Sequence, residues 1–276
     1  MNDTFGVGAV EQVANDVIVF DQAKDWSKAE AVTWRWSAPG AAPWVNLSDV
    51  RLRNTKLHDN VVLVTASGGR AAMLSRHSER VLWAATPGGN PHAIERLPGG
   101  VIVTASSAGY LRLYRPPSTT AFKKVPLPGA HGVLYDSKRE VLWTVGDKRL
   151  VRYRITGSGT GTRLHKVATK AIRGLGHDLQ PVYGDPDSLW FTDTYGVYRF
   201  DIPAKTFHEV DGANGVKSYV SQPSGLRART RADHGGPRKW AGPTVDFFRA
   251  SGDKAFSRTR RGAEFYKVRI WTPAFG

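Results

Sequence analysis

The chain of 276 residues contains no cysteine. Disulfide bonds and thiolate metal ligands are therefore excluded, while either redox compartment fits. Long apolar runs are also missing, because no stretch approaches the roughly 18 residues of a membrane-spanning helix. The first residues, Met1 to Phe5, lack the basic and apolar segments of an export signal. We therefore expect no membrane span, and either a cytoplasmic protein or an exported one whose signal is absent from this sequence.

Acidic residues are scarce relative to basic ones. Asp and Glu number 24 against 39 Lys and Arg, which gives a net charge of +15. Such an excess favours anionic partners, namely an acidic glycan, another anionic small ligand or nucleic acid. The basic residues are spread along the chain, without a long Lys/Arg tract or an RNA-binding aromatic motif. We therefore prefer an anionic glycan to nucleic acid, with a merely solubilising charge as the alternative.

Helical periodicity is nearly absent, whereas strand-like runs are frequent. Typical runs lie at residues 61–65 (VVLVT), 110–114 (YLRLY) and 189–192 (LWFT). Short turns separate the runs, in keeping with 29 glycines and 16 prolines. The pattern predicts an all-β meander of antiparallel strands.

A degenerate repeat is superimposed on these strands. The repeated segments are 48–76, 91–114, 130–153, 176–200 and 216–248. Within them, His92, His131 and His177 recur at intervals of 39 and 46 residues. Intervals of this length are typical of the four-stranded blades of a β-propeller.

A sixth unit is divided between the two ends of the chain. Residues 6–36 supply about three strands and residues 265–269 supply one. Their pairing completes a blade and removes exposed sheet edges. We therefore predict a single monomeric domain over residues 1–276, a propeller of six four-stranded blades, with seven blades as the alternative. Residues 227–261, rich in Gly, Pro and Arg, are expected to form long connections, and a linker between two domains is the competing interpretation.

Polar side chains recur where the first strand of each predicted blade begins. In the repeat alignment they are Asp49, His92, His131, His177, Lys217 and Lys267. Equivalent positions of successive blades surround one axis in a propeller, so we expect the three histidines to converge in a central pocket. A solvated polar channel without chemistry is the alternative interpretation.

Three neutral imidazoles can hold a divalent cation and leave coordination positions open. Gln180, three residues past His177, supplies a further oxygen. We therefore predict a metal site for Mn, Ca or Zn with the ligands His92, His131, His177 and Gln180, in which the ion is a Lewis acid. Without a metal, the same groups exchange protons near neutral pH.

The preferred reaction is β-elimination at a uronic acid of an anionic glycan, with hydrolysis or lactone opening as neighbouring possibilities. Elimination needs a base for the proton beside the carboxylate and a positive group to stabilise the enolate-like state. We assign catalytic roles to His131, Lys217, Lys267 and Tyr266. We assign substrate binding to Asp49, Gln222 and Arg269.

Several motifs around these residues are distinctive. They lie at residues 62–69, 89–92, 127–133, 176–184, 215–218, 222–225 and 265–267. In these motifs the chain resembles an uncharacterised bacterial β-propeller family, a domain of unknown function, over nearly its whole length. The resemblance implies the propeller architecture and, because many members look exported, a secreted or extracytoplasmic protein.

A looser similarity connects the chain with the metal-dependent oligogalacturonate lyases. It implies a central cation held by His92, His131, His177 and either Gln180 or Gln222. Those propellers have seven blades and a different ligand spacing, so the likeness is one of fold. Two other functions stay open: a non-catalytic propeller that binds a glycan or a protein, and a nucleic-acid binder attracted by charge alone.

Overall fold

The computed structural model describes residues 5–55 and 57–274. Strands dominate this part of the chain, and no α-helix occurs in it. Three short 3-10 turns are present: η1 (Ala29–Ala31), η2 (Pro98–Gly100) and η3 (Gly159–Gly161). Within the described ranges, none of the helical segments has the length or apolar character needed to cross a membrane.

The contacts divide the chain into two compact units, and each unit holds three sheets. Among the described residues, the first unit comprises 5–40 together with 177–272, and the second comprises 41–55, 57–176 and 273–274. Each unit is described by itself below.

The first unit contains three four-stranded sheets. One consists of β23 (Phe265–Ile270), β1 (Val7–Glu11), β2 (Asp16–Phe20) and β3 (Val32–Ser37). The next consists of β15 (Asp178–Val182), β16 (Asp185–Thr192), β17 (Val197–Asp201) and β18 (Thr206–Asp211). The last consists of β19 (Val216–Ser221), β20 (Arg227–Arg231), β21 (Thr244–Phe248) and β22 (Lys254–Thr259).

The second unit contains two four-stranded sheets and one of three strands among the described residues. The first consists of β4 (Leu47–Thr55), β5 (Asp59–Ala66), β6 (Arg70–Ser75) and β7 (Val81–Ala85). The second consists of β8 (Pro91–Arg96), β9 (Ile102–Ser106), β10 (Tyr110–Tyr114) and β11 (Phe122–Pro126). The third consists of β12 (Gly132–Asp136), β13 (Val141–Thr156) and β14 (Arg163–Leu175).

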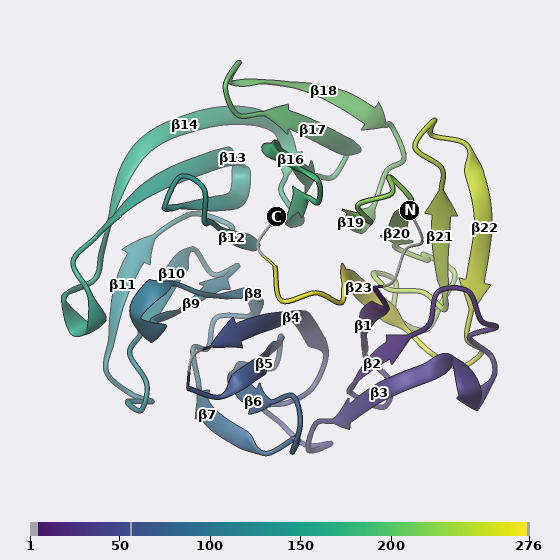
Figure 1. Cartoon of the computed structure of the whole chain (residues 1–276), viewed down its shortest axis with the longest axis horizontal. Helices are drawn as coiled ribbons and strands as arrows, with labels where there is room; N and C mark the ends of the chain where they lie inside the picture. The colour runs from purple at the N-terminus through teal and green to yellow at the C-terminus, as the bar shows by residue number, and fades with distance from the viewer. Residues whose placement is uncertain (1–4, 56, 275–276) are drawn as a thin grey trace. The chain divides into compact units, whose positions relative to one another are not determined.

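The fold is a six-bladed β-propeller, which confirms the predicted class. The division of one blade between the two ends of the chain is also confirmed, because β23 pairs antiparallel with β1. Figure 1 shows the yellow C-terminal strand beside the purple N-terminal one. One detail differs from the prediction. The blade formed by β12, β13 and β14 has three strands, and its two outer strands are unusually long.

The prediction of long connections over residues 227–261, interrupted by a strand-like run at 244–248, is correct only for residues 232–243 and for that run. Three strands of one blade, β20, β21 and β22, lie in that range, and the longest connection within it spans residues 232–243. Charged residues concealed β20 and β22, because exposed strand positions accept such residues without loss of pairing. In β20 the arginines alternate with buried Ala228 and Thr230.

Burial explains why some strands were easier to recognise than others. Residues 61–66 of β5 are all buried, and this strand reads as a continuous apolar run. The outer strand β11 is half exposed, so its sequence mixes Phe, Lys, Val and Pro. Propeller blades pack face to face, so that inner strands are covered on both sides while outer strands meet water.

The shared blade of the first unit is anchored by an aromatic cluster. Phe20 stacks on Trp26 at a centroid separation of 4.2 Å. Phe265, from the other end of the chain, meets both rings edge-on at 5.8 and 6.0 Å. All three side chains are fully buried. The pairing of β1 with β23 is therefore reinforced by side-chain packing as well as by backbone hydrogen bonds.

We expect Phe265→Ala to lower the free energy of unfolding by about 3–5 kcal/mol, because it leaves a cavity beside Phe20 and Trp26. Chemical denaturation measures the change. Phe122→Ala is the control, since Phe122 is 41% exposed and its loss should cost under about 1 kcal/mol. Equal losses for the two variants would show that the C-terminal strand is not integrated into the core.

Candidate functional site

The polar positions predicted from the repeat lie on the first strand of each sheet or immediately before it. These first strands are β4, β8, β12, β15, β19 and β23. Four of them have a register irregularity near their start, and the extra residues are Ser48, His92, Lys217 and Tyr266. A bulge of this kind leaves one residue outside the regular ladder and re-aims its side chain.

The other two first strands reach the same arrangement by another route. The N–H of His131 donates to the carbonyl of Val145 at 2.9 Å, and the following residue pairs with Val145 as well. The N–H of His177 donates to Thr192 at 2.8 Å in the same way, just before β15. His92, His131, His177 and Lys217 therefore occupy one equivalent position of the fold.

The repeat alignment was displaced by one residue in two blades. Ser48 and Tyr266 occupy the bulge, whereas the sequence reasoning placed Asp49 and Lys267 there. A bulge inserts a residue without changing the apolar pattern around it, so spacing alone does not reveal which neighbour is extra. Tyr266 is 3% exposed, and its carbonyl accepts a hydrogen bond from Thr230.

Two histidines stack within the second unit. The rings of His92 and His131 are 4.0 Å apart and inclined by 12°. They come from neighbouring blades, since β8 contacts β12. His131 Nδ1 lies 3.3 Å from the carbonyl of Gly129, which favours the tautomer with the proton on Nδ1. In that tautomer Nε2 is the basic nitrogen.

A histidine and a lysine meet within the first unit. Lys217 Nζ lies 3.4 Å from His177 Nε2, and the strands concerned, β19 and β15, are in contact. Burial lowers the pKa of Lys217 from 10.5 to about 8. An amine with this pKa exchanges protons readily near neutral pH, whereas an ordinary lysine is held almost wholly as the cation.

The predicted metal ligands are divided between the two units. His92 and His131 belong to the second unit and His177 to the first. Among residues 5–55 and 57–274, no three His, Cys, Asp or Glu side chains are arranged to hold a metal ion. The amide of Gln180 donates to Asp178 at 3.2 Å, and its side chain is buried. A metal ion and its identity therefore stay a prediction, which the described geometry does not support.

Lys267 and Arg269 lie in a buried ionic cluster of the first unit. Arg269 donates two hydrogen bonds to Asp178, of 2.8 and 3.0 Å. Lys267 Nζ lies 3.7 Å from the same carboxylate and is fully buried. One carboxylate therefore faces two cations, which favours a role in holding β23 against β15 over contact with a ligand.

The second unit has a corresponding cluster. Arg53 donates two hydrogen bonds of 2.8 Å to Glu95, and Arg51 lies 3.6 Å from the same carboxylate. Burial would raise the pKa of Glu95, but the charge and hydrogen bonds of Arg53 lower it below its ordinary value. Asp49 lies 3.5 Å from Arg51 and accepts from the N–H of Ile94 at 3.2 Å. Asp49 is thereby part of this buried network.

Sequence reasoning missed the partners Arg51, Arg53, Glu95 and Asp178. A usable signal existed in the alternation Asp49-Val-Arg51-Leu-Arg53, which places three charges on one face of a strand. Gln222 was assigned to substrate binding, yet it follows the far end of β19 from Lys217. Its amide donates to the carbonyl of Phe5 at 2.8 Å and to the side-chain oxygen of Gln22 at 3.1 Å. It connects two blades of the first unit.

The model of a family of unknown function, DUF6528, matches residues 10–271. The chain belongs to this family. The resemblance to an uncharacterised propeller family is thus confirmed, and the looser similarity to oligogalacturonate lyases stays a prediction. A comparison with curated proteins gives no match.

Solved structures share the fold of this DUF6528 member at low identity. A protein of unknown function from Bacteroides caccae is 11% identical with a TM-score of 0.63, and the match covers 96% of this chain and 97% of that chain. A functionally unknown protein from Desulfotomaculum acetoxidans DSM 771 is 12% identical with a TM-score of 0.61, over 98% and 99% of the two chains. A chain of a nidogen/laminin complex is 13% identical with a TM-score of 0.67, over 98% and 99%.

Lys217→Met should stabilise the DUF6528 protein at neutral pH. Folding lowers the lysine pKa from 10.5 to about 8, so its burial costs stability in full below pH 8. The cost disappears as the pH rises toward 10.5. We expect a gain of at most about 3 kcal/mol at pH 7, reduced by solvent screening. Unfolding measured between pH 7 and 10.5 tests this, with exposed Lys28→Met as the control; a gain that does not change with pH contradicts it.

Asp178→Asn should destabilise the first unit by about 3–5 kcal/mol, because it leaves Arg269 and Lys267 buried without a counter-charge. The substitution keeps the size of the side chain, so packing changes little. Thermal unfolding compares it with Asp253→Asn, an exposed position where we expect almost no effect. A loss no larger than that of the control would contradict a structural role for the cluster.

Proposed function

We propose that the protein acts on a carboxylate-bearing glycan at the start of β15 and β19, with uronate β-elimination as the reaction. The observation that supports this proposal is the contact of 3.4 Å between Lys217 Nζ and His177 Nε2, together with the lysine pKa of about 8. The two side chains are partly exposed, so they can meet a ligand as well as each other. The net charge of +15 favours encounter with an anionic substrate.

The pair can carry out elimination while holding a single positive charge. Neutral Lys217 takes the proton beside the uronate carboxylate, and the electron pair of that C–H bond becomes a carbon–carbon double bond. The neighbouring glycosidic C–O bond breaks, and the leaving oxygen receives a proton from protonated His177. The products are an unsaturated uronate and a free hydroxyl, with the positive charge now on Lys217. The positive charge on Lys217 stabilises the negative charge that develops on the uronate carboxylate during the reaction.

No step of this proposal uses a metal ion, since the described residues do not form a ligand group for one. His92 and His131 form a second imidazole site in the other unit, and metal binding there is a separate proposal. A shift of the melting temperature on addition of Mn, Ca or Zn, reversed by a chelator, would support it. Secretion also stays a proposal, based on the family resemblance.

A non-catalytic binding function is the second candidate. It is favoured by the similarity to a chain of a nidogen/laminin complex, a structure whose name describes a protein–protein assembly. In this case the bulge residues bind a glycan or a protein surface and transfer no proton. Nucleic-acid binding has only the charge of the chain in its favour. A strong, sequence-independent loss of affinity with salt would identify it.

A panel of uronate-containing glycans tests the enzymatic proposal through the absorbance of the unsaturated product. We expect His177→Ala and Lys217→Ala each to lower kcat/KM by about 100-fold or more, and exposed Lys28→Ala to leave it unchanged. Activity should fall as the pH rises above 8, because the pair then loses the single proton that the leaving oxygen requires. Binding of a glycan without product, unaffected by pH in this range, would replace the lyase by the binding function.

A further inference from the structure

Two arginines of the second unit converge on one glycine. Arg96 is the last residue of β8, Arg115 follows β10, and Gly100 ends the η2 turn between β8 and β9. A Cβ atom built on Gly100 would lie 3.4 Å from Arg115 Nη1 and 3.5 Å from Arg96 Nη2. Both guanidinium groups therefore reach the same point, and the missing side chain at Gly100 leaves them room.

A cavity of about 230 Å³ lies against the two arginines. His58, Thr55 and the Pro116-Pro117 segment also line it, together with apolar side chains. None of its lining residues, all of them described, is an aspartate or a glutamate. The cavity thus offers two permanent positive charges and no negative charge of its own.

The surroundings leave the arginine pair without acidic compensation. Burial lowers the pKa of Arg96, and the charge of Arg115 lowers it further. Glu95 acts in the opposite direction, but its carboxylate is bound by the guanidinium of Arg53. Arg115 donates to the carbonyl of Pro116 at 2.9 Å, a neutral acceptor. Two like charges close together, one on half-buried Arg96 and one on exposed Arg115, favour the binding of an anion.

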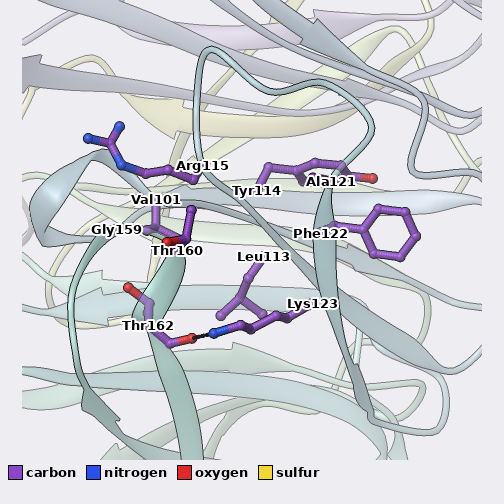
Figure 2. A pocket seen from close by; sticks show the side chains of 10 residues that line it. All are labelled: Val101, Leu113, Tyr114, Arg115, Ala121, Phe122, Lys123, Gly159, Thr160 and Thr162. Atoms are coloured by element: carbon purple, nitrogen blue, oxygen red, sulfur yellow. Dashed lines mark hydrogen bonds between the residues drawn. The ribbon is translucent and has the colours of Figure 1, made fainter.

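Arg115 also lines a neighbouring cavity of about 160 Å³, drawn in Figure 2. Its guanidinium lies on the far side of that cavity from Lys123, beyond Gly159 and Thr160. Lys123 Nζ donates to the carbonyl of Thr162 at 3.0 Å. The lysine is thereby held by backbone of the β13–β14 connection, and Arg96 lines the other cavity but not this one.

This feature is separate from the histidine pair of the same unit. His92 lies at the start of β8 and Arg96 at its end. Four residues of extended strand separate them by about 13 Å. A ligand held by the arginines therefore need not involve the residues of the proposed reaction.

We propose that Arg96 and Arg115 bind the phosphate group of a small phosphorylated molecule in this cavity. A phosphate monoester carries about two negative charges at neutral pH, which matches the charge of the pair, whereas a carboxylate carries one. Guanidinium forks match phosphate oxygens through paired hydrogen bonds. The cavity volume of about 230 Å³ suits a compact charged group.

Calorimetric titration of the whole protein tests the site with four probes: a hexose phosphate, inorganic phosphate, inorganic sulfate and the unphosphorylated hexose. The ionic strength is kept constant with chloride. We expect saturable binding of the hexose phosphate, weaker binding of the two inorganic ions, and none of the free hexose. Arg96→Gln and Arg115→Gln should each weaken hexose phosphate binding by about tenfold or more. Arg80→Gln removes an exposed arginine elsewhere in the same unit and should not change it.

The melting temperature gives an independent readout. Without phosphate, Arg96→Gln should melt no lower than the parent protein, because it removes a repulsion. With phosphate, the parent protein should gain stability and the variant should not. Equal weakening by Arg80→Gln, or binding of the free hexose as tight as that of its phosphate, would overturn the proposal. Binding of a single-stranded oligonucleotide without binding of any small phosphate would overturn it as well, in favour of a nucleic-acid surface.

Discussion

The structure depends on charges that are buried between strands and neutralised there. The first strand of a blade is covered on both sides, yet several of these strands carry arginine, lysine, aspartate or glutamate. In the first unit Arg269 is bound by Asp178, and in the second Arg53 is bound by Glu95. Removing water from such groups is costly unless the geometry is good, so each pair requires a particular alignment of two blades. The pairs thereby specify which strands lie together, beyond what apolar packing requires.

Titratable residues outside these ionic clusters lie at the beginning of the same strands or just before it. The bulges at His92 and Lys217, and the equivalent positions of His131 and His177, take these side chains out of the regular ladder. Two parts of the same strand therefore differ in role. The charged side chains in its middle are neutralised by partners and hold the blades together, while the residues at its start present titratable groups. The lysine pKa of about 8 follows from this position, because burial dehydrates Lys217.

The architecture could be predicted from the sequence because it follows from local periodicity. Repeated histidines at blade-length intervals and a divided terminal unit were enough to indicate six blades. The ionic partners could not be predicted, because Arg53 and Glu95 are 42 residues apart and their contact depends on how two blades pack. Bulges also escaped detection, which is why Asp49 and Lys267 were exchanged with their neighbours Ser48 and Tyr266. The arginine pair was missed because Arg96, Gly100 and Arg115 lie at three separate strand ends and turns.

The divided blade has a consequence for the order in which the chain can fold. Strands β1, β2 and β3 are synthesised long before β23, but the edge of β1 opposite β2 has no partner until residues 265–270 of β23 have been made. During that interval an unpaired strand edge is exposed on a nascent protein, which is a risk for association with other chains. The earliest part of the sequence is thus among the last to be completed, and a ribosome that stalls late leaves the first blade open.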